Sequence, residues 1–361
     1  MKNSEEWEKE KIYDRQLRLW GVKAQNRMMK SNVLILGLSG INIEICKNLI
    51  LNGINITIID DNIVNEEMVE NIFFLNESDI NNYACVAIFK ELKSINKMIN
   101  MKAYIGRMDT PNDSIIIDSE LVQNGNGEIN YPLYKLVKMN EFCHEKNIGF
   151  FAAMCNGKFA FLFSDFGNHV IEESYYKVKE GQKKGETGAN KAGDLQKKDE
   201  TGANKAGDLQ KKDETGANKA GDLQKKDETG ANKAGIQIQY CKLSHFLKVP
   251  FENFDKKTNK IIFPMFALIL FEQNKQLNKN DKSIDEQEFY TFCDQFSLSK
   301  CKESLGEITK TYRVAFSPSC SIMGGVTSQE IRKFVSKQHE SIPNFCVFDM
   351  NQNVVCTSMI S

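Results

Sequence analysis

Arginine is scarce in this sequence. Only six of its 47 basic side chains are arginines, and three of those six, Arg15, Arg18 and Arg27, lie near the N-terminus. Because lysine supplies most of the positive charge, a task that needs a planar guanidinium must fall on very few positions. An excess of charge is missing too, since the 48 acidic side chains nearly balance the basic ones. The overall charge therefore favours neither nucleic acid nor a membrane surface as a partner.

Metal-binding and membrane-spanning patterns are also missing. The ten cysteines include no C-x-x-C pair, and no group of cysteines and histidines has the spacing of a zinc site. The longest apolar run, residues 261–271, contains a proline and is too short to cross a bilayer. The acidic N-terminus lacks the apolar core of a secretory signal. We expect free thiols in a reducing compartment, no metal site, and a soluble intracellular protein.

A repeat interrupts the chain. The 14-residue unit KKxETGANKAGDLQ begins at Lys183 and occurs in three full copies and a fourth, incomplete one. Each full copy contains one leucine and no aromatic residue, so it cannot bury a hydrophobic core. We therefore predict a disordered linker over 176–235. It separates a first folded part, 31–175, from a second, 236–361, which completes the same fold, and a helical segment covers 1–30.

The first folded part alternates strands and helices. NVLILGL at 32–38 and INITIID at 54–60 are apolar, β-branched runs typical of buried strands, and the residues between them have apolar side chains at helical spacing. This βαβ pattern predicts an α/β fold with a doubly wound, Rossmann-like mixed sheet that is parallel in its first half. Further strands are expected at 99–105, at 114–118 and in GFFAAMC and KFAFLFSD, and helices at 76–95 and 131–147. The second part is expected to be helical up to a hairpin of NFCVFDM and NVVCTSM.

The stretch KIYDRQLRLWG at 11–21 is predicted to be an amphipathic helix. At 100° per residue, Tyr13, Leu17, Trp20 and Ala24 share one apolar face. Arg15 points away from that face, so the helix can dock and still present Arg15 on its other side. A lone arginine on a surface helix is most often a solvated charge, and this pattern alone gives Arg15 no role.

The turn after the first strand matches a phosphate-binding loop only in part. It reads GLSGIN at 37–42, and Asp60 ends the second strand. A dinucleotide turn has glycines where the backbone approaches the pyrophosphate, and an acid for the ribose. Here Ser39 and Asn42 stand where the G-x-G-x-x-G pattern has glycine. Their side chains would crowd a phosphate, so the sequence favours a structural turn over a nucleotide site.

Several stretches together resemble the Aos-type small subunit of SUMO-activating enzymes, in the family of ubiquitin-like-protein activating enzymes. They are YDRQLRLWG, VLILGLSG, KNLILNGI at 47–54, SPSCSIMGGVTSQEIRKF at 317–334, EFCHEKNIGFFAA and NFCVFD. The resemblance covers nearly everything outside the repeats. It implies a ThiF/MoeB-like adenylation fold, in which two related halves form a heterodimer and only one half binds ATP.

This chain resembles the inactive half. The active half has four glycines in its turn and an Asn-Arg-Gln run after the second strand, whereas the run here is Asn71-Ile72-Phe73. A lysine expected on the next helix falls near Tyr83. The resemblance therefore implies that ATP and Mg are bound mainly by the partner subunit and that the isolated chain is inactive. We expect Ile72 and Phe73 to be core residues.

The resemblance also gives Arg15 a role. In the family, the arginine of the YDRQ motif reaches from the inactive subunit into the ATP site of its partner, so Arg15 is the candidate catalytic and ATP-contacting residue. The thioester cysteine belongs to the partner, and none of the cysteines here, Cys143 included, is expected to replace it. The implied partners are a larger catalytic subunit, SUMO or another ubiquitin-like protein and, through the complex, a conjugating enzyme, in the nucleus and cytoplasm.

Three alternatives stay open. One is a catalytically silent scaffold, which a single-turnover adenylation assay with and without the chain would distinguish. ENIFFL resembles the regulatory subunit of the enzyme that activates the cullin-modifying ubiquitin-like protein, although that subunit has a much longer middle domain. An NAD-dependent oxidoreductase can begin with the same βαβ unit, but the four histidines, at 144, 169, 245 and 339, show no hydride-handling arrangement.

The segment at 317–334 is predicted to begin as a turn of small residues and to continue as an amphipathic helix. Its glycines, Gly324 and Gly325, permit another backbone to approach closely. We expect them to serve packing and the contact with the partner subunit, and not to bind phosphate.

Overall fold

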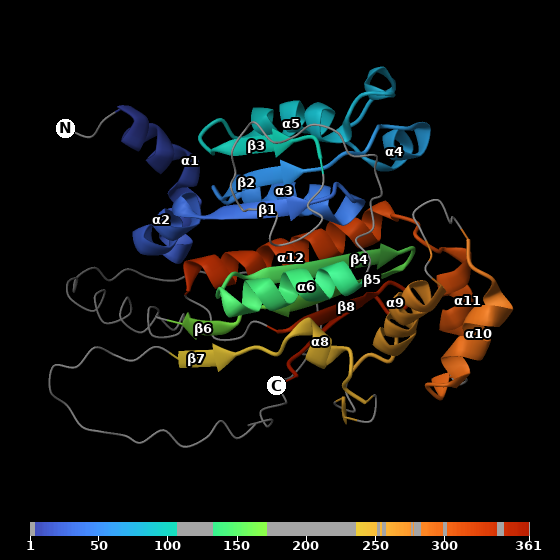
Figure 1. Cartoon of the computed structure of the whole chain (residues 1–361). Coiled ribbons are helices and arrows are strands. Elements are labelled where there is room, and N and C mark those ends of the chain that lie inside the picture. Colours follow the sequence, from blue (N-terminus) through green and yellow to red (C-terminus); the bar gives the residue numbers. More distant parts are fainter. Residues whose placement is uncertain are drawn as a thin grey trace, which may run out of the picture. The chain divides into compact units, whose positions relative to one another are not determined.

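A computed structural model gives the fold of the chain (Figure 1). The structure describes residues 4–106, 133–171, 236–250, 253–254, 258–275, 277, 283–298, 302–337 and 343–360. The strand predicted at 114–118 and the linker with its repeats lie outside these residues. All described residues belong to one compact unit, and none of their helices is long and apolar enough to span a membrane.

Three parallel strands form the first sheet, in the order β1-β2-β3. They are β1 (Asn32–Leu36), β2 (Asn55–Ile59) and β3 (Met101–Tyr104), with α3 (Gly40–Leu51) between the first two. The predicted βαβ unit is therefore confirmed. Between β2 and β3 the chain forms α4 (Glu66–Asn71), the 3-10 helix η1 (Glu77–Asp79) and α5 (Ala84–Ile95).

The helix predicted at 76–95 is interrupted in the structure. Asn81 has a left-handed backbone, with φ of 70°, and Tyr83 pairs with Ile63 in an isolated β-bridge. An α-helix cannot continue through either feature, so only the second half of the predicted range is α-helical.

A second sheet is antiparallel, with the strand order β4-β5-β8-β9. Its strands are β4 (Phe150–Asn156), β5 (Phe159–Asp165), β8 (Phe345–Asp349) and β9 (Val354–Ser358), and the last two form the predicted terminal hairpin. A small separate pair joins β6 (Asn168–Ile171) to β7 (Ile236–Gln239). The fold is thus mixed α/β with a parallel first half, as predicted.

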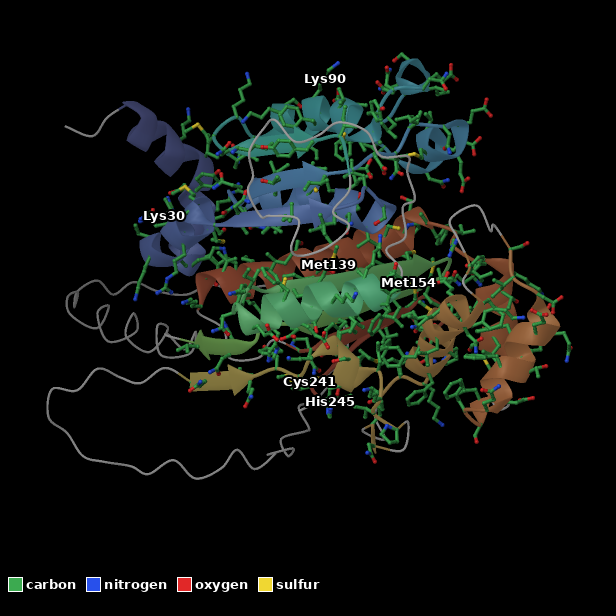
Figure 2. All side chains as sticks on the ribbon, viewed as in Figure 1. Lys30, Lys90, Met139, Met154, Cys241 and His245 are labelled. Atoms are coloured by element: carbon green, nitrogen blue, oxygen red, sulfur yellow. The ribbon has the colours of Figure 1, made fainter. Side chains whose placement is uncertain are left out.

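Helices cover the second sheet and close a second core. Met139 of α6 is buried in this core and Met154 of β4 packs against it (Figure 2). The helices are α6 (Leu133–Glu145), α8 (Leu243–Phe246), α9 (Ile262–Lys275), α10 (Glu286–Asp294) and α11 (Lys302–Lys310). The apolar run at 261–271 lies largely in α9, where most of its side chains are buried.

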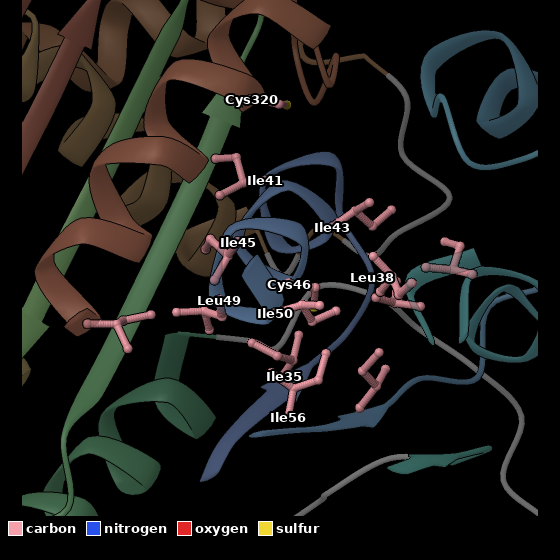
Figure 3. Packing of buried hydrophobic residues seen from close by; sticks show 14 of the residues in the cluster. Ile35, Leu38, Ile41, Ile43, Ile45, Cys46, Leu49, Ile50, Ile56 and Cys320 are labelled. Carbon is pink, nitrogen blue, oxygen red and sulfur yellow. The ribbon is translucent and has the colours of Figure 1, made fainter. Parts of the chain in front are cut away.

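Helix α12 (Ser317–Ser336) packs against α3, with Cys320 of α12 and Ile41 of α3 at the contact (Figure 3). A side chain added at Gly40 would lie 2.9 Å from Sγ of Cys320, and one added at Gly324 would lie 2.5 Å from Cβ of Glu44. The predicted turn at its start is wrong: α12 is helical from Ser317, because a proline at its N-terminus fits the first helical turn. The close packing predicted for the two glycines is confirmed for Gly324 only, since the space beside Gly325 is open.

The N-terminal segment forms two helices, α1 (Ser4–Trp20) and α2 (Val22–Lys30). They are separated by Gly21, whose φ of 83° suits glycine. The predicted apolar face is therefore shared between two helices. Tyr13 and Ala24 are buried, and the guanidinium of Arg332 in α12 lies 3.9 Å from the ring centroid of the half-buried Trp20.

Candidate functional site

The turn after β1 is closed by its own side chains. Oγ of Ser39 accepts a hydrogen bond from the Asn42 backbone N–H at 3.3 Å, which caps α3. The Asn42 side-chain amide donates to the carbonyls of Gly37, at 2.8 Å, and of Leu36, at 3.2 Å. The two residues that replace glycine thus stabilise the turn itself, as the sequence indicates. They engage backbone groups, among them the Asn42 N–H, that a phosphate-binding loop leaves available to its ligand.

Asp60 stabilises this turn through hydrogen bonds of its buried side chain and does not face a ligand. Its side chain is buried, and it accepts hydrogen bonds from the backbone N–H of Leu38, at 2.8 Å, and from the backbone and side chain of Asn62, at 3.0 and 2.7 Å. A ribose would have to displace these donors, so the acid is structural here. The sequence did not point to Asn62, although an aspartate side chain commonly accepts a hydrogen bond from the backbone two residues further on.

A cavity of about 1960 Å³ lies beside the turn. Among its described lining residues the only base is Arg313, whose guanidinium pairs with Glu272 at 3.0 Å. Glu44, Asp61 and Glu67 also line it, so acids exceed bases. Triphosphate binding needs cations or free backbone donors. Among the described lining residues, none supplies an unpaired cation for a triphosphate.

The run Asn71-Ile72-Phe73 corrects one prediction. Phe73 was expected in the core, but it is 93% exposed. Helix α4 ends at Asn71, and the Leu75 backbone N–H donates to the carbonyl of Ile72 at 3.0 Å, so Phe73 and Phe74 are the two central residues of a turn. Ile72 and Phe74 pack against the first core, and Phe73 between them points out.

Arg15 differs from every other described arginine. It is exposed, and no hydrogen bond or ion pair joins it to any residue that the structure describes. The other four are all engaged, through Asp14, the carbonyl of Ser336, Glu272 and the ring of Trp20; they are Arg18, Arg27, Arg313 and Arg332. Arg27, Arg313 and Arg332 thus tie distant parts of the fold together, and Arg18 pairs with a neighbour on its own helix. Arg15 alone among the described arginines makes no such contact.

Apolar side chains flank Arg15 on its own helix face. Ile12 and Leu19 lie three residues before it and four after it, which places all three on one face of α1, and they are 50% and 52% exposed. No residue of α1 is among those that line the cavity beside the turn. The chain therefore does not bring Arg15 to its own turn.

The family model for ThiF matches residues 13–359. The chain belongs to the ThiF family. It is similar to "SUMO-activating enzyme subunit 1" of Xenopus laevis, with 26% identity over 93% of this chain and 91% of that protein. It is equally similar, at 26% over 94% of this chain and 92% of that protein, to "SUMO-activating enzyme subunit 1B-1" of Arabidopsis thaliana. Subunit 1 of Homo sapiens is 24% identical, over 93% of this chain and 91% of that protein.

The Cys143 thiol of this ThiF-family chain is poorly placed as a nucleophile. Burial and, to a lesser degree, the nearby Asp165 carboxylate raise the pKa of the Cys143 thiol to about 11. The neighbouring His144 was expected to be a packing or surface residue, yet its Nδ1 lies 2.9 Å from Oδ2 of the fully buried Asp165. Asn140 donates to the same carboxylate at 2.8 Å. This network ties α6 to the end of β5 and leaves Cys143 protonated at neutral pH.

Proposed function

We propose that this chain is the small, non-catalytic subunit of a heterodimeric SUMO-activating enzyme. The observation that carries the proposal is the end-to-end similarity to SUMO-activating enzyme subunit 1 from an animal and a plant, over at least nine-tenths of each chain. In this role the chain supports ATP-dependent adenylation of the SUMO C-terminus and transfer to a cysteine of a larger subunit.

The closed turn supports the non-catalytic part of this proposal. Ser39 and Asn42 complete the turn, and Asp60 is saturated with donors from the chain itself. The adjacent cavity has more acids than bases. ATP and Mg are therefore assigned to the larger subunit.

Arg15 is proposed to act in trans. Its guanidinium is unpaired within the described chain, and an exposed apolar pair flanks it. A partner that covers Ile12 and Leu19 would desolvate Arg15 and direct it toward phosphate oxygens. There the planar fork would neutralise negative charge more effectively than a lysine.

The cullin-type and NAD-dependent alternatives have weaker support. The relatives named above are SUMO-type subunits, which favours that branch over the one that serves the cullin-modifying protein. An NAD site would need a ribose-binding acid, but Asp60 is buried and its oxygens are engaged.

Reconstitution tests the proposal. The full chain is mixed with the larger SUMO-activating subunit and SUMO, and adenylate is followed by ATP–pyrophosphate exchange with and without the chain. We expect exchange only when the chain is present. We also expect that the isolated chain binds neither ATP nor NAD tightly. Exchange that is independent of the chain, or tight nucleotide binding by the isolated chain, would contradict the proposal. The partner of the cullin-type enzyme, paired with its own modifier, serves as the specificity control.

A further inference from the structure

One face of α1 is tied to the rest of the chain by three side chains. They lie three and four residues apart, so they share that face; they are Tyr13, Gln16 and Trp20. Arg15 projects from a different side of the helix, and none of the described residues forms a hydrogen bond or ion pair with its guanidinium. The direction in which Arg15 leaves the chain is therefore set by how the tied face holds α1.

One buried amide joins Tyr13 to α3 and to the end of α5. Nδ2 of Asn96 donates to the Tyr13 hydroxyl at 2.7 Å and to the carbonyl of Ile50 at 2.9 Å. Oδ1 of Asn96 accepts from the Met98 backbone N–H at 3.0 Å. Gly53 makes room for the aromatic ring, since a side chain at that position would lie 2.9 Å from Cζ of Tyr13. Because Tyr13 and Asn96 are both buried, a shift of α1 that separated them would break a hydrogen bond in the interior.

Gln16 forms a second tie one turn further along α1. Its Nε2 donates to the carbonyl of Leu51, the last residue of α3, at 2.8 Å. The last carbonyls of a helix have no partner inside it, so this acceptor is available to a side chain from outside. Two hydrogen bonds one turn apart, from Tyr13 and Gln16, fix both the rotation of α1 about its axis and its position along that axis.

The rotation of α1 decides where Arg15 points. A side-chain group about 6 Å from a helix axis moves by about 2 Å when the helix rotates by about 20°. Displacement of a catalytic group by about 1 Å can lower a rate by about 10²-fold. The flexible stem of an arginine compensates for part of such a shift, so we expect a smaller loss when Arg15 is displaced.

We propose that Tyr13 and Gln16 are positioning residues for Arg15. Their hydrogen bonds, to Asn96 and to the carbonyl of Leu51, hold α1 in the rotation that directs the guanidinium toward the ATP phosphates of the larger subunit. This inference rests on the proposed function. Neither side chain contacts ATP in this role, because both are bonded to their own chain. They act only through Arg15, which distinguishes them from residues that merely stabilise the fold.

Gln25 makes a matched contact from the next helix. Its Nε2 donates to the carbonyl of Asn52, the residue after Leu51, at 3.0 Å. In both glutamines the amide oxygen is buried without a hydrogen-bond partner, so replacement by leucine removes the same kind of bond. Gln25 belongs to α2, which Gly21 separates from α1. Its bond therefore stabilises the fold without setting the rotation of α1.

A double-mutant cycle in the reconstituted heterodimer tests the inference. ATP–pyrophosphate exchange is measured with full-length proteins and SUMO, at a saturating concentration of the larger subunit. Gln16→Leu and Tyr13→Phe are each made in the wild-type chain and in the Arg15→Ala chain. In the wild-type chain each should lower kcat by about 5- to 20-fold and leave the KM for SUMO unchanged. In the Arg15→Ala chain neither should lower the remaining rate by more than about twofold, because the residue they position is gone.

Gln25→Leu is the control, and it should leave the exchange rate unchanged while lowering the thermal stability about as much as Gln16→Leu. Suppose that Arg15→Ala is slow but the Gln16 and Tyr13 variants are normal, or are slowed equally in both backgrounds. They then do not position Arg15, and the proposed function stands. Equal slowing by Gln25→Leu would also overturn the inference, since stability alone would explain the loss. If Arg15→Ala itself exchanges normally, the proposed role of Arg15 fails and the inference fails with it.

Discussion

The turn at 37–42 and the face of α1 around Arg15 differ in whether their polar side chains have partners within the chain. At the turn, the Asn42 amide donates to the nearby carbonyl of Gly37, and Asp60 accepts from Asn62 and, across 22 residues of chain, from Leu38, so the site is closed. On α1, Arg15 has no partner among the described residues. Folding satisfies buried polar groups almost without exception. The polar group that remains unused at the surface is therefore the better candidate for work on another molecule.

The largest expected effect is at Arg15. Arg15→Ala should leave the heterodimer intact and slow adenylate formation by roughly 10²- to 10³-fold, because an arginine supplied in trans stabilises the charge of the transition state. Pyrophosphate exchange in the purified heterodimer measures the rate.

Arg18→Ala is the matched control for this variant. Arg18 lies on the same helix but pairs with Asp14 at 3.1 Å, and both side chains are exposed, so its loss should change little. A normal exchange rate for Arg15→Ala would leave Arg15 as a solvated charge and remove the contrast with the turn.

Asp60→Ala should be the most damaging change at the turn. It leaves donors of Leu38 and Asn62 without an acceptor in the interior, which costs about 2–3 kcal/mol of the free energy of unfolding. Urea denaturation followed by circular dichroism measures the loss. The neighbouring Asp61, whose Oδ2 is buried without a partner, provides the control: Asp61→Ala should change stability by less than about 1 kcal/mol. Equal losses at both positions would mean that Asp60 does not hold the turn.

His169 is a third case, a buried polar ring that remains partly unsatisfied. Its Nε2 has no hydrogen-bond partner, and its ring lies 4.9 Å from that of Phe334. Burial, and to a lesser degree the charge of Lys337, lowers the pKa of His169 to about 4. A histidine with a depressed folded-state pKa stabilises the protein fully above its unfolded value and loses that contribution as pH falls toward the folded value.

The wild type should therefore lose about 2–3 kcal/mol between pH 7 and pH 4 through His169 alone. His169→Phe should lose correspondingly less over the same range, because it cannot be protonated. Urea titrations of both proteins across this range measure the difference. Parallel pH profiles would show that folding does not change the pKa of His169.

Substitutions at the two glycines of α12 should have opposite effects on stability. Gly324→Ala places a Cβ 2.5 Å from Cβ of Glu44 on α3, and overpacking of this kind costs about 1–3 kcal/mol. Gly325→Ala meets open space and should stabilise the helix by up to about 1 kcal/mol. Thermal unfolding of both variants measures the difference. The contact predicted with the partner subunit now falls on Gly325, and a Gly325→Val variant that binds the larger subunit normally would remove it.

The smallest effect is expected at the repeats. Replacing 183–235 with a short Gly/Ser loop should leave heterodimer formation and thioester transfer unchanged, since loop-closure cost grows only with the logarithm of length. Loss of the complex would show that the repeats do more than connect.

Local patterns predicted the elements whose periodicity was unambiguous. The apolar runs around α3 gave the βαβ unit, and the NFCVFDM and NVVCTSM runs formed the terminal hairpin β8–β9. The start of α12 was missed because small residues and glycines suggest a turn when they stand alone, while contact with α3 selects them for close helix packing. Phe73 was misplaced because an apolar side chain alone does not show that its residue lies at the corner of a turn, where it points to solvent.

The sequence by itself determined that the turn lacks the glycines of a phosphate loop and that Arg15 lies opposite the apolar face of its helix. Only the tertiary structure decided that Asp60 is saturated by Leu38 and Asn62, and that the other described arginines are engaged elsewhere. The physical reason is distance along the chain. Turn chemistry and helical periodicity act between near neighbours, whereas the ties from Arg27 to Ser336 and from Arg332 to Trp20 join residues about 300 positions apart and form only when α12 packs against the N-terminal helices.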